Sequence, residues 1–199
     1  MKRESIVNLT YLALFVALIL VLAFTPLGYL KIVGVMEITF IGVPVLIGAL
    51  ILGPSAGALL GLVFGLTSLA STPSNPLFGP LLPSYPVQIA LMCIVPRVLV
   101  GLIAGWLGKL LKKTLKNEIA AFSITALVGS LANTVLFIGS IFVLMYKPVI
   151  EAMDITPAAF TAFWVGIGAT NGIPEAIACV IIVTAATKAI TAYQRRKGK

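Results

Sequence analysis

The sequence contains no histidine, and charged residues make up only 10% of its 199 positions. Without imidazole groups, the chain lacks the side chain that most often binds metals and moves protons near neutral pH. It also lacks the G-x-x-x-x-G-K-[ST] phosphate loop, an HExxH motif and a nucleophile-plus-base arrangement. We therefore expect no ATP hydrolysis by this chain, no enzymatic activity, and neither a metal nor a cofactor.

Cysteine is scarce as well. Cys93 and Cys179 are the two cysteines, and both lie within apolar segments. They show no metal-ligand spacing, so we interpret them as small buried apolar residues.

Apolar residues dominate what is present. Hydrophobic residues make up 60% of the chain, and no charge occurs between Ile38 and Pro96. Because a bilayer core of about 30 Å requires roughly 20 apolar residues per helix, the length suffices for about six spanning helices. We therefore expect an all-α integral membrane protein, a single six-helix domain over residues 1–199.

Proline, glycine and charge divide the chain into these helices. We expect them at about 8–24, 38–53, 55–69, 85–111, 119–146 and 157–192. The second begins irregularly, the fourth is interrupted at Pro96–Arg97, and the sixth is interrupted at Gly172–Pro174. Ordered outer connections are expected at 25–37, 70–84 and 147–157, the second of them without regular structure.

Glycine recurs every fourth residue in one stretch, at Gly53, Gly57, Gly61 and Gly65. This spacing forms a stripe along one side of a helix, where a second helix backbone approaches closely. In water, each interior glycine would cost about 1 kcal/mol relative to alanine. The stripe therefore indicates a helix packed inside a membrane bundle.

The basic residues indicate the orientation. With both termini and the 109–116 connection in the cytoplasm, only Lys31, Lys147 and Arg97 of the 14 Lys and Arg residues lie elsewhere. This excess follows the positive-inside rule, so the net charge of +8 indicates orientation and lipid contact rather than nucleic-acid binding. The N-terminal segment lacks a cleavage pattern, and we expect it to remain as a helix.

Two charges, Arg97 and Glu175, lie clearly inside the expected spans, away from their ends, and each directly follows a proline. A charge there costs at least about 2.5–3.5 kcal/mol, so it must be paired or lie in a polar cavity. Proline also frees a backbone carbonyl one turn earlier, at Met92 and at Thr170. We expect a polar pocket for a small polar or anionic ligand, reached from outside, with these further polar residues: Thr67, Ser68, Asn133 and Asn171.

Other interpretations of the pair stay open. Arg97 and Glu175 would form a purely structural ion pair if they only fix the packing of the helices, as in a structural membrane subunit. Glu175 would act as an acid or base if the chain were an intramembrane enzyme. The ion pair and the pocket are also compatible, because Glu175 can orient Arg97 while the guanidinium keeps donors for a carboxylate.

The whole chain resembles the substrate-binding S components of energy-coupling factor (ECF) vitamin transporters. The resemblance rests on Ala13-Leu-Phe-Val-Ala17, ITFIGVPVLIGALILGPSAGALLGLVFGLTS, VPRVLVGLIAGWL, GSLANTVLFIG and NGIPEA. The GLTS, VPRVLVG and NTVLF segments are most similar to the pantothenate-specific branch. The resemblance implies six helices with cytoplasmic termini in the prokaryotic cytoplasmic membrane, and a site on the last three helices capped by the first and third outer connections.

The resemblance also implies partners and residue roles. The face of Ala13 and Ala17 would dock on the transmembrane T component, and two ATPase subunits would drive toppling of the S component. In our hypothesis Arg97 binds the pantothenate carboxylate, and Asn133 and Asn171 bind its amide and hydroxyls. Rim positions would be Asn75, Tyr85 and Trp164. An S component for a different vitamin or precursor is the alternative.

Overall fold

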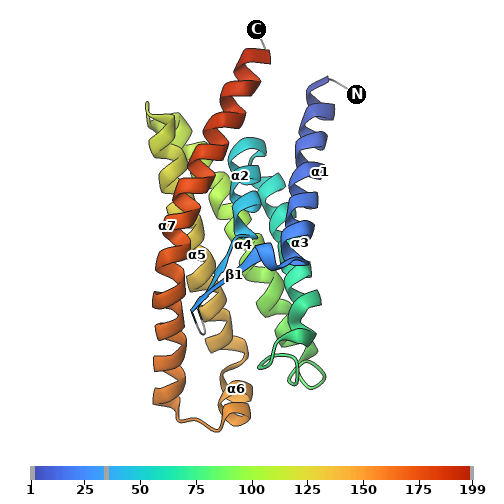
Figure 1. Ribbon diagram of the computed structural model, residues 1–199, viewed down its shortest axis with the longest axis vertical. Coiled ribbons are helices and arrows are strands. Elements are labelled where there is room, and N and C mark those ends of the chain that lie inside the picture. Colours follow the sequence, from blue (N-terminus) through green and yellow to red (C-terminus); the bar gives the residue numbers. More distant parts are fainter. Residues whose placement is uncertain (1–2, 34–35, 198–199) are drawn as a thin grey trace.

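The computed structural model describes residues 3–33 and 36–197, and this part of the chain is mostly helical (Figure 1). Its helices are α1 (Arg3–Ala23), α2 (Gly42–Leu52), α3 (Pro54–Ser71), α4 (Pro86–Thr114), α5 (Glu118–Leu144), α6 (Tyr146–Met153) and α7 (Pro157–Lys197). Two 3-10 turns, η1 (Pro26–Gly28) and η2 (Thr72–Ser74), and two strands, β1 (Tyr29–Val33) and β2 (Met36–Thr39), complete the order. The predicted all-α class is confirmed.

Among the described residues, five helices are long and apolar enough to cross a membrane: α1, α3, α4, α5 and α7. The second expected span differs. Strand β2 continues to Thr39, and α2 begins only at Gly42 and has 11 residues. At 1.5 Å per residue such a helix covers about 16 Å, roughly half of the bilayer core. Of the six spanning helices predicted, five are therefore long enough to cross the membrane, and the second is not.

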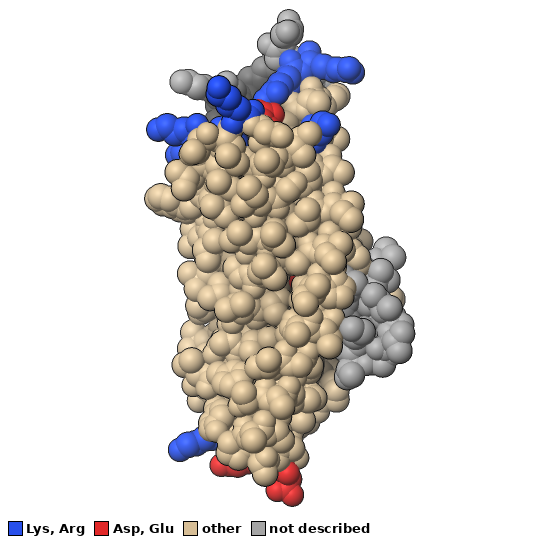
Figure 2. All heavy atoms as spheres, turned by 90° about the vertical axis from the view of Figure 1, so that its left-hand side faces the viewer, with Lys and Arg blue, Asp and Glu red and all other residues tan. Residues whose placement is uncertain are grey.

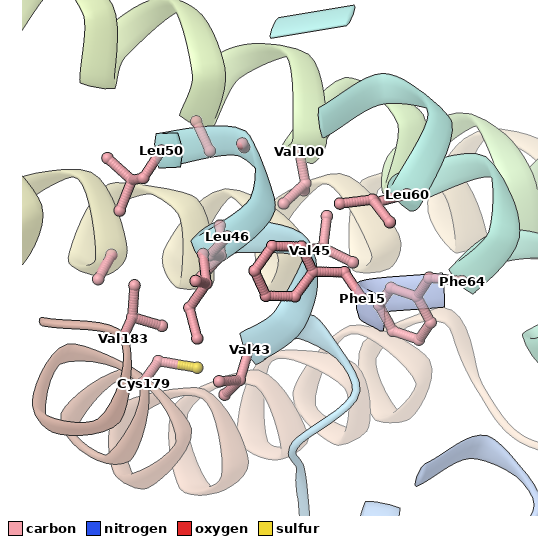
Figure 3. Close-up of a cluster of buried hydrophobic side chains, with 14 of the residues drawn as sticks. Phe15, Val43, Val45, Leu46, Leu50, Leu60, Phe64, Val100, Cys179 and Val183 are labelled. Carbon is pink, nitrogen blue, oxygen red and sulfur yellow. The ribbon is translucent and has the colours of Figure 1, made fainter. Parts of the chain in front are cut away.

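Helix α2 lies at the centre of the bundle. Every residue from Val43 to Leu50 is buried, and α2 contacts α1, α3, α4, α5 and α7. Figure 3 shows side chains of surrounding helices, among them Phe15, Leu60 and Val183, gathered around it. A helix that is apolar on all sides is stable only when it is enclosed in this way. Because α2 is short, it fills the interior of only one half of the bundle, and other segments line the interior of the other half.

Three glycines of the predicted stripe pack α3 against α4: Gly57, Gly61 and Gly65. Gly53 instead lies outside the helix at its N-cap, with a positive φ of 95°. A Cβ added to Gly61 would lie 2.8 Å from the carbonyl carbon of Arg97. One added to Gly65 would lie 2.8 Å from the Cα atom of Ile94. Real Cβ atoms do not approach so closely, so the two backbones meet where only hydrogen fits. This contact fixes the position of the α4 segment that carries Arg97.

The expected interruptions at Pro96 and Pro174 are wrong. Both prolines lie inside continuous helices, α4 and α7. A proline removes one helical hydrogen bond, but neighbouring groups can satisfy the freed carbonyl within a packed membrane helix. In α4 the Arg97 guanidinium donates to the carbonyl of Met92, which Pro96 leaves free.

The boundaries of two further segments also differ from the expectation. In the connection expected at 25–37, strands β1 and β2 pair antiparallel and form a hairpin with Tyr29 opposite Thr39, while residues 34–35 lie outside the described residues. The Phe40 N–H donates to the Gly28 carbonyl at 3.0 Å. The connection expected at 147–157 contains α6, so α5 ends at Leu144 instead of residue 146. The segment expected at 70–84 without regular structure is helical over its first five residues, the end of α3 and η2, and the expectation holds only beyond Ser74.

The two ends of the molecule differ in charge. Helix α1 begins and α7 ends at the same end, where α4 also passes into α5 (Figure 1). Lysine and arginine side chains gather at that end, and the other end carries both signs (Figure 2). An ion pair between Arg195 and Glu118 joins α7 to α5 there. We call this the basic end, and the opposite end the outer end, because the positive-inside rule would place the basic end in the cytoplasm.

Candidate functional site: a cavity in the outer half of the bundle

A cavity of about 980 Å³ lies between α3, α4, α5 and α7. Within the described chain its walls include the stretches 64–72, 92–97, 133–138 and 163–175, and Thr39 of the hairpin closes part of it. All four stretches lie toward the outer end, beyond the start of α2. The cavity separates the apolar cluster around α2 from a second cluster at the outer end that contains Phe78, Ile141 and Phe160. It therefore occupies the half of the bundle that the short central helix does not fill.

Seven of the nine predicted site residues line this cavity. They come from four helices and one loop: Ser68, Asn75, Arg97, Asn133, Trp164, Asn171 and Glu175. The intramembrane charges and the two asparagines thus share one chamber, although up to 78 positions separate them in the sequence. A site for a small polar ligand needs this combination of a few polar groups on an apolar wall.

Two predicted residues do not line it. The Thr67 hydroxyl is buried and donates to the Phe64 carbonyl of its own helix at 2.8 Å. Tyr85 precedes α4 and lines a separate depression at the outer end, together with Lys147 and Glu151 of the α6 region. Thr67 points away from the side of α3 on which Ser68 lies. Tyr85 is outside the cavity for a different reason, because it is about three helical turns from Arg97.

Arg97 is held from three sides. Its Nη1 donates to the Met92 carbonyl at 2.9 Å. Its guanidinium carbon lies 4.3 Å from the centre of the Phe137 ring and 5.5 Å from that of Phe64. The residue is 7% exposed. Cation–π contacts with two aromatic rings stabilise the cation and limit its movement, which favours carboxylate recognition.

Glu175 lies on the opposite wall, on α7, and is 8% exposed. Its Oε2 accepts a hydrogen bond from the Thr39 N–H at 3.4 Å, which joins α7 to strand β2. The carboxylate also interacts with the Asn133 side chain and is attracted by Arg97. Glu175 is therefore tied to α5, to the hairpin and to the charge of Arg97 at once.

Three further polar atoms are buried at the cavity without a hydrogen-bond partner among the described residues. They are Oδ1 of Asn133, Oδ1 of Asn171 and Nε1 of Trp164. Two acceptors and one donor left unsatisfied would cost about 1–3 kcal/mol each unless water or a ligand meets them. Together with Arg97 they can bind a small organic anion that also carries amide or hydroxyl groups.

Some lining residues were not predicted. Phe64 and Phe137 stack on Arg97, but an aromatic residue in a spanning helix gives the same sequence signal when it only packs. Thr39 contributes through its backbone, which leaves no mark in the sequence. Ser71 and Thr72 did carry a signal, because they continue the hydroxyl-rich run that contains Ser68.

The predicted partner face of α1 is exposed. Ala13 and Ala17 both lie at the surface, while Phe15 and Ile19 of the same helix are buried against the bundle. Helix α1 has the apolar surface of a lipid- or protein-facing helix, with Leu14 54% exposed. Ala13 and Ala17 therefore point away from the bundle, as a docking face must.

Comparison with known proteins gives one family. A family model described as "ECF transporter, substrate-specific component" matches residues 7–186. The pantothenic acid transporter PanT of Lactococcus lactis subsp. cremoris (strain MG1363) is 31% identical to this chain over 202 residues. That similarity covers 96% of this chain and 97% of PanT.

Proposed function

The chain belongs to the family of ECF transporter substrate-specific components, and we propose that its cavity binds pantothenate for uptake into the cell. It is thus a component of a transporter, and its long apolar helices fit a multi-pass membrane protein. The single observation that carries the ligand proposal is the cavity itself, in which one stacked guanidinium faces buried amide groups.

The chemistry of pantothenate matches this lining. The molecule has one carboxylate, one amide and two hydroxyls on a short aliphatic chain. The carboxylate pairs with Arg97, because a guanidinium binds a planar carboxylate with two parallel hydrogen bonds. The Oδ1 atoms of Asn133 and Asn171 accept from the hydroxyl and amide donors of the ligand, and Trp164 donates from Nε1. Ser68 and Asn75 lie on the α3 side of the same cavity.

Delivery involves partners in this proposal. Helix α1 docks through Ala13 and Ala17 on the transmembrane T component, because small exposed residues allow a second helix to approach closely. Two ATPase subunits supply the energy, since the chain has no phosphate loop of its own. Both termini lie on the cytoplasmic side, which agrees with the gathering of lysine and arginine at the basic end.

Calorimetric titration of the purified protein tests the proposal. We expect submicromolar binding of pantothenate and at least about 100-fold weaker binding of vitamins that lack a carboxylate, because those leave Arg97 uncompensated. Arg97→Ala should abolish the binding while the thermal transition of the protein persists. Tight binding of a different vitamin, with none of pantothenate, would refute the ligand assignment but leave the family unchanged.

A further inference from the structure

A second depression lies at the outer end of the bundle, between the beginning of α4 and helix α6 (Figure 1). It has a volume of about 500 Å³. Its described lining comes from two stretches of the chain, 85–88 and 142–151. None of these lining residues belongs to the described wall of the ligand cavity. The depression is therefore a separate feature that vitamin binding does not explain.

The depth of this depression in the membrane follows from helix length. Helix α4 has 29 residues and α5 has 27, which correspond to about 43 and 40 Å at 1.5 Å per residue. A bilayer has a hydrocarbon core of about 30 Å and measures about 40–45 Å with its head groups. The first turn of α4 and the last turn of α5, which border the depression, therefore lie at the level of the outer head groups. Tyr85 and Tyr146 line it, and tyrosine is typical of this level.

One side of the depression faces lipid. Val143 lines it and is 81% exposed, and Val87, in the first turn of α4, is 65% exposed. Helix α6 is amphipathic, because Val149 is fully buried against the bundle while Lys147 and Glu151 are exposed. A molecule in the depression can thus extend apolar chains beside Val143 while its polar part contacts α6.

The polar part of the depression contains both signs of charge. Among its described lining residues, Lys147 is the one cation and Glu151 the one anion. They are four residues apart on α6, so the two side chains lie along one face of the helix. Within the part of the chain that the structure describes, neither side chain takes part in a hydrogen bond or an ion pair. A head group with a phosphate and an ammonium, joined by a short link, would pair with both charges at once.

We propose that this depression binds the head group of an outer-leaflet phospholipid that carries a primary ammonium, as phosphatidylethanolamine does. Lys147 pairs with the phosphate, and Glu151 accepts hydrogen bonds from the ammonium. A choline head group has the same two charges, but its quaternary ammonium has no N–H to donate. Glu151 therefore distinguishes the two head groups. The site is independent of the vitamin cavity and does not depend on the identity of its ligand.

Native mass spectrometry of the full-length protein tests the proposal, with mixed micelles that contain equal amounts of phosphatidylethanolamine and phosphatidylcholine with matched acyl chains. Both lipids have no net charge, so the net charge of +8 on the chain favours neither. We expect the protein to retain the ethanolamine lipid at least about tenfold more than the choline lipid. Glu151→Gln should lower this ratio by about fivefold, because a neutral oxygen binds an ammonium less tightly. Asp154→Asn removes the same charge from an exposed residue outside the depression and should leave the ratio unchanged.

Lys147→Ala should lower the retention of both lipids by about tenfold, because both carry the phosphate. Lys116→Ala, between α4 and α5 at the basic end, should leave it unchanged. Equal retention of the two lipids by the unmodified protein would overturn the proposal. So would a ratio that falls equally in Glu151→Gln and Asp154→Asn. If Lys147→Ala slowed pantothenate association and left lipid retention intact, the depression would serve the vitamin, and the lipid assignment would be wrong.

Discussion

Arg97 donates from Nη1 to the carbonyl of Met92 at 2.9 Å, and this carbonyl is the one that a proline at position 96 leaves without its helical donor. The proline and the arginine thus act as one unit. Proline creates a buried acceptor, and the neighbouring guanidinium satisfies it while stacking on Phe137. We infer that this hydrogen bond helps to orient the cation toward the cavity.

Replacing Pro96 with alanine tests that dependence. The new N–H at position 96 can donate to the Met92 carbonyl and compete with the guanidinium. We expect pantothenate affinity to fall by about fivefold to tenfold, because one hydrogen bond of about 1 kcal/mol no longer orients Arg97. Calorimetry measures the affinity, and thermal melting verifies that the bundle persists. Unchanged affinity would show that Arg97 is oriented without the freed carbonyl.

The substitution Gly61→Ala tests the close approach of α3 and α4. The added methyl group would meet the backbone of Arg97, so α4 must shift. We expect a loss of about 1–3 kcal/mol in stability and weaker ligand binding, as for other overpacked contacts. Thermal melting in detergent and calorimetry measure the two effects.

Gly139→Ala is the matched control, because a Cβ there meets nothing within 4 Å. It should leave both measurements unchanged. If Gly61→Ala were equally harmless, the glycine contact would not determine the position of Arg97.

A change on the exposed face of helix α1 should affect assembly with the T component and leave pantothenate binding intact. Ala13→Trp places a large ring on the exposed face of α1, so pantothenate binding should persist while copurification with the T component is lost. Ala185→Trp makes the same change at an exposed position of α7 and should retain assembly. Assembly that survives Ala13→Trp would place the docking face elsewhere.

The loop at the cavity mouth gives a further prediction. Because Oδ1 of Asn75 accepts from two backbone N–H groups, Asn75→Ala should loosen the loop at a cost of about 1 kcal/mol and accelerate ligand dissociation severalfold. Asn117 makes the same kind of contact at the basic end, with the N–H groups of Ile119 and Ala120. Asn117→Ala should therefore cost similar stability and leave dissociation, followed by stopped-flow fluorescence, unchanged.

The sequence was most informative where membrane physics restricts the choice of residues. Charges are expensive in hydrocarbon, so the positions of Arg97 and Glu175 within apolar segments were enough to predict a polar cavity. The glycine spacing likewise predicted the closely packed side of α3, since few other patterns permit such an approach.

The sequence was least informative where a tertiary contact replaces a local one. Pro96 predicts a break in isolation, but the Arg97 side chain satisfies the freed carbonyl, and α4 continues. The hairpin of Tyr29–Val33 and Met36–Thr39 was missed because two strands of five and four residues give too short an alternation. Thr67 and Ser68 are adjacent in the sequence, and helical direction alone decides which of them lines the cavity.

The central claim is that the Arg97 guanidinium binds the carboxylate of the ligand in this cavity. Titrating pantothenate and its alcohol analogue, in which the carboxylate is replaced by CH₂OH, into the unmodified protein and into Arg97→Gln tests it most directly. We predict at least about 100-fold preference for the carboxylate in the unmodified protein and almost none in Arg97→Gln, because the pairing is then absent from both. The same preference in both proteins would contradict the account.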